Sequence, residues 1–377
     1  MEAWKPKYLP NVNSQSSNPE IEKVSSYPWF DWLRFILASI VVLAHANFQF
    51  FPFLDGALAV AVFFALSGWL IGGILLRTKF DELPRFFYNR ATRIWIPYAV
   101  AAVLLYGFAA IHEGVDFFWV KYLILDLTFT HQLYTFFPAA LYEMPLDGTG
   151  NQFWSISVEE QFYLIAPLII IFTSLGNSIK CWSIIAVFMV LLDWNFAAIS
   201  LGVCTAILQR DFNFASRLSV RVGAIATALV CAIGMSVFDT KFVFQPLLAV
   251  SVVIAVAIPG ARSSLAMTFG GLSYPLYLNA WIGGFAVNFF TKRWLPIDAT
   301  TFMITQYVLN VMLAFAMYWV IDREIQKRRN AWFSPLVGRI LALTAYGLVG
   351  TGIIVGAAMH VFGPHADIPT ASYRSDK

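Results

Sequence analysis

The chain has 377 residues, of which 59% are hydrophobic and only 12% are charged, and its mean hydropathy is +0.68. Soluble globular domains carry roughly 25% charged residues, so this composition excludes an ordinary water-soluble protein and predicts a chain embedded in a lipid bilayer. The net charge is only +3, and we expect no nucleic-acid partner.

Eleven apolar runs are long enough, or nearly long enough, to cross a bilayer, which takes about 20 helical residues. They lie at residues 30–53, 57–76, 94–111, 152–175, 180–193, 195–208, 221–238, 242–259, 265–290, 302–321 and 336–361. We therefore predict an all-α fold, a polytopic membrane bundle of about 10–11 transmembrane helices. It forms one domain over residues 30–361, between polar tails at 1–29 and 362–377.

Basic residues are concentrated in two segments, 77–93 and 323–339, each of which contains five Lys or Arg residues. The longest polar connection, 112–150, contains Lys121 as its single basic residue. By the positive-inside rule we expect both basic segments in the cytoplasm and the 112–150 connection outside. This pattern predicts a multi-pass protein of the cell (inner) membrane with a cytoplasmic N-terminus and an uncleaved first helix.

The first apolar run carries two ionisable side chains, Arg34 and His45. They are eleven residues apart, so on a helix they share one face to within about 20° and are separated by about 16 Å along the axis. Because burying such groups in a membrane is costly, they usually mark function. We predict that Arg34 holds an anion at the cytoplasmic mouth and that His45 is a general base. The alternatives are an arginine that snorkels to the headgroups and a histidine that only hydrogen-bonds another helix.

The next two runs supply further candidates. Gly68 and Gly72 form the small-xxx-small pattern of closely packed helices, and Ser67 precedes them as a polar group or another small packing residue. Arg90 and Arg93 are three residues apart and share a helical face near the inner membrane surface. This pair either serves topology alone or binds phosphate. Ser67, Arg90 and Arg93 are therefore candidate residues for a binding site.

Later runs contain carboxyl, hydroxyl and amide groups. Glu159 and Glu160 lie about two turns into an apolar helix, where adjacent side chains diverge by about 100°. We predict that Glu159 is catalytic, where it orients a histidine, takes up a proton or binds a sugar hydroxyl, and that Glu160 lines the cavity. The alternative is exposure at the outer interface. Tyr274, Tyr277 and Asn279 follow in a proline-interrupted helix, where they either line the cavity or join helices.

Five separated motifs of this chain resemble those of the acyltransferase-3 family, multi-pass bacterial membrane enzymes that O-acylate carbohydrates. In chain order they are DWLRFILASIVVLAH (31–45), FFALSGWLIG (63–72), RATR (90–93), FWSISVEEQFYLIAPL (153–168) and SYPLYLNAW (273–281). The first has the family's ten residues between an arginine and a histidine, and the fourth is close to its W-S-L-x-V-E-E-Q-F-Y-L block. These two motifs are the specific ones.

The resemblance adds two residues to the predicted cavity, Asp31, three residues before Arg34, and Trp154 in the fourth motif. One departure concerns Asn279, which stands where many family members have a histidine. The resemblance therefore implies that the role of that later histidine is absent here or filled by another group.

Residues and resemblance together predict a membrane-bound O-acyltransferase. It moves an acyl group, in the simplest case acetyl from acetyl-CoA, to a hydroxyl of a cell-surface or exported carbohydrate. Acyl-CoA is a co-substrate from the cytoplasm and is bound by Ser67, Arg90 and Arg93. The carbohydrate acceptor binds on the extracytoplasmic side. A thioester supplies its own driving force, so we expect no cofactor, and the three widely spaced cysteines predict no disulfide framework or metal site. The alternatives are a transporter or flippase of sugar-linked or small-molecule substrates, and a purely structural scaffold.

Overall fold

The computed structural model describes residues 26–366 except 47, 52, 138, 174, 193–195, 239–240 and 294–296. Every regular element in this described part is a helix, so the predicted all-α fold is confirmed. Most of the two polar tails predicted at 1–29 and 362–377 lies outside the described residues.

The helices follow one another in this order: α1 (Trp29–His45), α2 (Gly56–Leu75), η1 (Phe80–Glu82), α3 (Leu83–His112), α4 (Phe117–Leu127), η2 (His131–Tyr134), α5 (Ala140–Glu143), α6 (Pro145–Gly148), α7 (Phe153–Ile170), α8 (Ile179–Leu191), α9 (Phe196–Phe212), η3 (Phe214–Ser216), α10 (Leu218–Val237), α11 (Lys241–Val256), α12 (Ser264–Leu278), α13 (Ala280–Arg293), α14 (Ala299–Met317), the π-helical turn η4 (Tyr318–Asp322), α15 (Arg323–Trp332) and α16 (Pro335–Phe362).

Each apolar run predicted from the sequence overlaps a helix, with three differences. The run at 30–53 is helical only as far as His45, where α1 ends. The run at 265–290 is divided at Asn279 into α12, which contains Pro275, and α13. The connection at 112–150, expected to be a polar loop, contains the apolar helix α4. Its start is capped by Asp116, whose side chain accepts a 2.7 Å hydrogen bond from the backbone N–H of Trp119.

Five described helical segments have the length and hydropathy needed to cross a membrane. They are Gly56–Leu75, Phe80–His112, Leu218–Val237, Ala299–Trp332 and Pro335–Phe362. Shorter apolar helices accompany them at Ile179–Leu191, Lys241–Val256 and Ala280–Thr291. These helices support a membrane protein, and the total of 10–11 spans stays a prediction.

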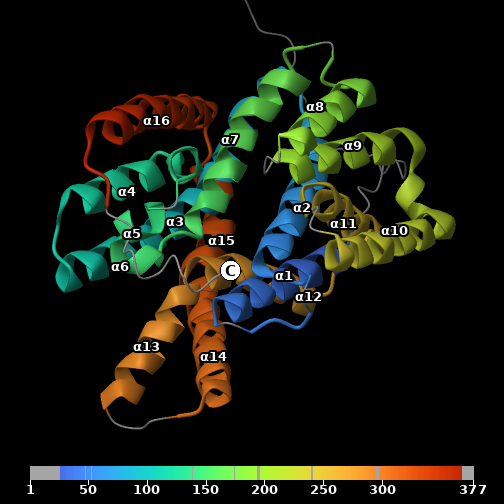
Figure 1. Cartoon of the computed structure of the whole chain (residues 1–377). Helices are drawn as coiled ribbons and strands as arrows, with labels where there is room; N and C mark the ends of the chain where they lie inside the picture. Colours follow the sequence, from blue (N-terminus) through green and yellow to red (C-terminus); the bar gives the residue numbers. More distant parts are fainter. Residues whose placement is uncertain are drawn as a thin grey trace, which may run out of the picture.

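Helix α7 lies centrally in the molecule, with α3, α4 and α16 on one side and α8 to α11 on the other (Figure 1). Helix α2 packs against α9, and α1 packs against α12. A Cβ atom on Gly68 would lie 2.1 Å from the carbonyl oxygen of Ile199, and one on Gly202 would lie 2.2 Å from that of Ala65. Glycine therefore allows the backbones of α2 and α9 to approach closely, as expected for Gly68.

Candidate functional site

Helices α1, α2, α3, α7 and α12 surround a cavity of about 280 Å³, which we call the inner cavity. Four arginines contribute to its wall: Arg34, Arg90, Arg93 and Arg262. Glu159 is the carboxylate among its lining residues. Arginine presents five N–H donors and no acceptor, so this wall is suited to bind an anion that carries phosphate groups.

The carboxylate of Glu159 is held by two hydroxyl groups. Ser67 on α2 donates a 2.6 Å hydrogen bond to Oε1, and Tyr163, one turn further along α7, donates a 2.9 Å bond to Oε2. Glu160 points elsewhere, because neighbouring positions on a helix diverge by about 100°. It accepts a 3.0 Å hydrogen bond from the indole N–H of Trp95 and is absent from the lining of the inner cavity.

Asp31 positions two of the cavity arginines from behind the wall. Its carboxylate lies 3.1 Å from Arg34 Nη1 and 3.0 Å from Arg262 Nε, and the residue is buried. The pair of Asp31 and Arg34 lies within one turn of α1, whereas Arg262 comes from the segment before α12. A Cβ atom on Gly270 would lie 2.8 Å from Asp31 Cβ, so a glycine is needed where α12 crosses α1 at this point.

His45 lies in a second and larger cavity of about 830 Å³, which we call the outer cavity. Its Nδ1 atom lies 2.7 Å from the carbonyl oxygen of Val41. A carbonyl oxygen can only accept a hydrogen bond, so the neutral ring carries its proton on Nδ1. The lone pair is then on Nε2, and that nitrogen can accept a proton.

The structure does not bring every predicted site residue together. Arg34, Ser67, Arg90, Arg93 and Glu159 line the inner cavity, whereas His45, eleven residues after Arg34 on α1, lines the outer one. The hydrogen-bond partner of the imidazole is a backbone carbonyl and not Glu159. The expectation that Glu159 orients a histidine therefore has no contact to support it in this conformation.

The two cavities meet at Tyr277, which lines both. Its hydroxyl lies 2.6 Å from Ser155 Oγ and donates a 3.1 Å hydrogen bond to the carbonyl oxygen of Gln152. Ser155 lines the inner cavity and Gln152 the outer one. These three residues therefore form part of the wall between the cavities, and they join the start of α7 to the end of α12.

The other residues predicted to line a cavity have separate surroundings. Tyr274 lines the inner cavity and donates a 3.2 Å hydrogen bond to the carbonyl oxygen of Ile94. Asn279 is buried at the end of α12 and donates a 3.0 Å bond to the carbonyl oxygen of Pro275. Trp154 packs edge-on against Phe64 and lines a smaller cavity beside α11. Asp31, Glu160 and Asn279 lie outside the lining of the inner and outer cavities.

Sequence reasoning missed Arg262 and Tyr163 in the inner cavity. Tyr163 is four residues after Glu159, so helical periodicity was a signal that would have found it. Arg262 had no such signal, because its partner Asp31 is 231 residues away in the sequence.

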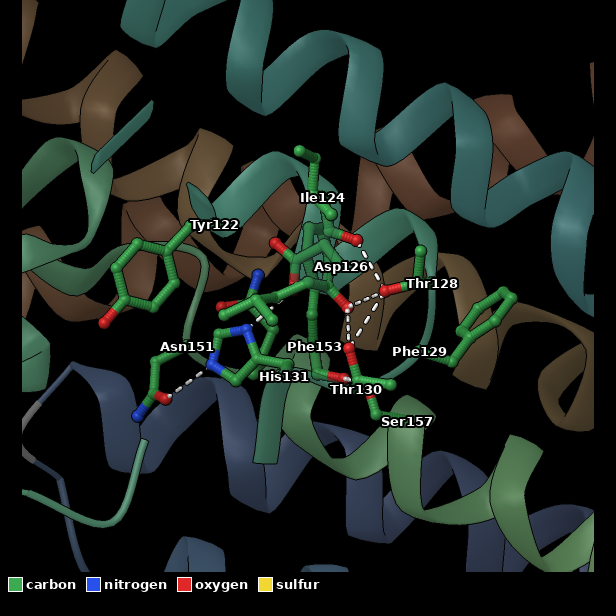
Figure 2. Close-up of polar contacts among 12 residues, drawn as sticks. Tyr122, Ile124, Asp126, Thr128, Phe129, Thr130, His131, Asn151, Phe153 and Ser157 are labelled. Carbon is green, nitrogen blue, oxygen red and sulfur yellow. Dashed lines mark hydrogen bonds and ion pairs between the residues drawn. The ribbon is translucent and has the colours of Figure 1, made fainter. Parts of the chain in front are cut away.

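A buried polar cluster in the 112–150 connection was also missed (Figure 2). His131 lies between Asp126, at 2.6 Å from Nδ1 to Oδ1, and Asn151, at 3.3 Å from Nε2 to Oδ1. Tyr106 donates a 2.5 Å hydrogen bond to the other oxygen of Asp126. His131 and Asp126 are buried and lie outside the lining of both cavities. The cluster therefore fastens α3 and α4 to the segment that precedes α7.

Comparison with known proteins agrees with this architecture. The curated relatives it matches include a putative O-acetyltransferase of Staphylococcus aureus (strain COL), 29% identical over 211 residues, which are 51% of this chain and 32% of the relative. Another is the peptidoglycan O-acetyltransferase OatA of Listeria monocytogenes serovar 1/2a, 30% identical over 156 residues, 37% of this chain and 23% of the relative. A third, the O-acetyltransferase OatA of Staphylococcus aureus (strain NCTC 8325), is 29% identical over 157 residues, 38% of this chain and 25% of the relative.

The chain thus spans at most about a third of the length of these relatives, and no solved structure matches it. The acyltransferase-3 family model, described as an acyltransferase domain, matches residues 27–348. This range contains α1 to α15 and both cavities. On this evidence, the chain belongs to the acyltransferase-3 family.

Proposed function

We propose that the protein is a membrane-bound O-acyltransferase that moves an acyl group, in the simplest case acetyl from acetyl-CoA, to a hydroxyl of a carbohydrate outside the cell membrane. The observation that carries this proposal is the pair of cavities that meet at Tyr277. One is rich in arginine, and the other contains a histidine with a free lone pair. Family membership and the names of the O-acetyltransferase relatives support it.

The donor end of the reaction belongs in the inner cavity. Acyl-CoA approaches from the cytoplasm, and its phosphate groups are attracted by Arg90, Arg93 and Arg34 through charge-assisted hydrogen bonds. The thioester then points towards Tyr277. Glu159, which is hydrogen-bonded to Ser67 and Tyr163, balances part of the positive charge of the arginines. The arginines therefore bind the CoA product less tightly than they would without it.

His45, in the outer cavity, acts as the general base or as the nucleophile of the acyl transfer. The acceptor oxygen forms a bond to the thioester carbonyl carbon while its proton passes to Nε2 of His45. The C–S bond breaks, and CoA leaves as a thiolate that takes up the proton. Alternatively, Nε2 first accepts the acyl group from CoA and then passes it to the acceptor. Both routes use the lone pair of Nε2, and the hydrogen bond from Nδ1 to Val41 selects the tautomer of the neutral ring that has its lone pair there.

A transporter or flippase is the second candidate, because cavities on two sides of a thin wall are also found in alternating-access proteins. Purified protein separates the two. An acyltransferase releases free CoA thiol from acetyl-CoA in the presence of a glycan acceptor and raises the acceptor mass by one acetyl group. A transporter does neither, so the absence of acceptor acetylation with any surface glycan would contradict the proposal.

The donor site has its own test. Arg90→Ala together with Arg93→Ala should raise the KM for acetyl-CoA by roughly tenfold or more, because each charge-assisted hydrogen bond contributes about 1.5–3 kcal/mol. Arg339→Ala is the matched control, since Arg339 lies at the start of α16 and lines neither cavity. An unchanged KM in the double variant would leave the pair as a topology signal.

A further inference from the structure

A third cavity, of about 780 Å³, lies beside the inner one. It is formed by the segment before α1, the end of α2, the end of α9 and the segment before α12. Leu70, Ile74 and Arg262 line both this cavity and the inner cavity, so the two meet at these residues. We call the third cavity the vestibule. The basic 77–93 segment begins at its edge, on the side expected to face the cytoplasm.

The inner cavity is too small for a whole CoA molecule. Sites that enclose a drug-sized ligand have volumes of roughly 300–1,000 Å³, and the inner cavity measures about 280 Å³. Coenzyme A, with its nucleotide and its long pantetheine arm, is larger than a typical drug. The inner cavity therefore accommodates only part of the donor, and the remainder needs a second site that meets the first.

The charges in the vestibule suit the part of CoA that the inner cavity does not accommodate. Arg77, Arg210 and Arg262 line it, and no acidic residue is among the lining residues in the described part of the chain. Arg262 pairs with Asp31, and Arg210 pairs with Asp211 at 2.7 Å. Arg77 differs from both. Its Nε donates a hydrogen bond to the carbonyl oxygen of Gly73 on its own helix, and it forms no ion pair with the residues that the structure describes. Its charge is therefore available to a ligand.

The vestibule also offers aromatic rings. Tyr27, Phe30 and Trp69 line it, and the ring of Trp69 lies 5.8 Å from each of the other two, centroid to centroid. All three side chains are buried, so they give the vestibule an apolar wall, and a purine base would pack against the edge of this wall. Gln209 and Asn213 line the same cavity, and Gln209 Nε2 donates a 2.7 Å hydrogen bond to Asn213 Oδ1. The amide N–H groups of Asn213 are of the type that hydrogen-bonds base edges.

We propose that the vestibule binds the adenosine 3′-phosphate end of CoA, with Arg77 as the contact to the 3′-phosphate. Arg262 lies at the junction, where the diphosphate passes into the inner cavity towards Arg34, Arg90 and Arg93. The pantetheine arm occupies the rest of the inner cavity. This assignment rests on the proposed function and extends it, because it names the part of the donor that each cavity recognises.

The test compares acetyl-CoA with acetyl-dephospho-CoA, which lacks only the 3′-phosphate. For the wild-type chain we expect the KM of acetyl-dephospho-CoA to be about tenfold or more above that of acetyl-CoA, the range of one charge-assisted contact. In Arg77→Ala this ratio should fall towards one, because the contact is absent for both donors. Arg77→Lys should restore part of the ratio. Arg217→Ala, an exposed arginine outside the vestibule lining, should keep the wild-type ratio.

A binding measurement tests, independently of turnover, whether the vestibule binds the adenosine 3′-phosphate end of CoA. Adenosine 3′,5′-bisphosphate, which has no pantetheine arm, should bind the purified full chain in calorimetry, and Arg77→Ala should weaken its affinity about tenfold. Equal affinities in wild type, Arg77→Ala and Arg217→Ala would overturn the vestibule assignment. If transfer from acetyl-CoA continues with a ratio that Arg77→Ala leaves unchanged, the assignment fails and the acyltransferase proposal stands. If the bisphosphate binds through Arg77 but no acyl transfer occurs, the acyltransferase proposal fails instead.

Discussion

The hydroxyl of Tyr277 on α12 lies 2.6 Å from Ser155 Oγ on α7, and Tyr277 lines both the inner and the outer cavity. The ring and its hydrogen bonds therefore form part of the wall between the arginine-rich inner cavity and the outer cavity that His45 lines. An acyl group that passes from one cavity to the other must pass this side chain.

Removing the ring of Tyr277 should uncouple the release of CoA from the acetylation of the acceptor. We expect Tyr277→Ala to join the cavities and admit water to the thioester, so that more CoA thiol is released than acceptor is acetylated. Tyr277→Phe keeps the ring and loses only the hydroxyl contacts, so its ratio of thiol to acetylated acceptor should stay close to wild type. The two products are measured in one assay, and an unchanged ratio in Tyr277→Ala would contradict the role of the wall.

Replacing His45 tests the general base. His45→Gln retains hydrogen-bonding groups but cannot take up a proton at neutral pH, so we expect transfer to fall by about 100-fold or more. The melting temperature should change little, because His45 is exposed and its hydrogen bond is to its own helix. His112→Gln changes another exposed histidine, outside both cavities, and serves as the control. Near-normal turnover of His45→Gln would show that His45 only packs.

The two adjacent glutamates should respond differently to the same substitution. Glu159→Gln removes the carboxylate from the arginine-rich cavity, so we expect kcat to fall while the KM for acetyl-CoA stays equal or decreases. Glu160→Gln can still accept the hydrogen bond from Trp95, and it lies outside the cavity lining, so it should keep its kcat. Steady-state kinetics of both variants check this, and equal losses of kcat would place the effect in folding rather than in the site.

A buried ion pair outside the cavities should control stability. Lys121 Nζ lies 2.6 Å from Glu143, both side chains are fully buried, and His365 also contacts this carboxylate at 2.9 Å. Burial alone would raise the pKa of Glu143, but the hydrogen bonds from Lys121 and His365 outweigh it and hold the pKa below its ordinary value. Stability from this group is therefore present above about pH 4.3, the unfolded value, and is lost as the pH falls through the lower folded value.

Removing one partner should cost more than removing both. Glu143→Gln leaves the Lys121 charge buried without its partner, and we expect a loss of about 3–5 kcal/mol in the free energy of unfolding. The double variant Lys121→Met with Glu143→Leu should recover most of it. Thermal unfolding in detergent measures the three proteins. A double variant no more stable than Glu143→Gln would contradict the coupling.

Cysteine accessibility tests the orientation. In a chain whose native cysteines are replaced by alanine, Val115→Cys should react with a membrane-impermeant maleimide added to intact cells, and Lys79→Cys should react only after lysis. Both positions are exposed. Labelling of Lys79→Cys from outside would reverse the proposed entry of donor and acceptor.

The sequence by itself determined the features that depend on one helix. Apolar runs predicted the helices of ten or more residues except α4 and the polar helix α15, because their hydrophobicity far exceeds that of a soluble chain. The eleven-residue spacing placed Arg34 and His45 on one helix. The divergence of adjacent positions indicated that Glu159 and Glu160 would face different surroundings, as they do. These features follow from the 3.6-residue repeat, which is local.

Only the tertiary structure decided which of these residues share a space. Arg34 and His45 lie on one helix yet face different cavities, because α7 and α12 bring Ser155 and Tyr277 between them. Arg262 forms an ion pair with Asp31, which is 231 residues away in the sequence, and helical periodicity cannot predict a pair so far apart. Contacts between helices depend on how side chains of distant segments fit together, and glycine approaches such as Gly68 on Ile199 set the distances. The sequence of one helix does not indicate which other helices pack against it. Which residues share a cavity was therefore decided by the packing of the helices.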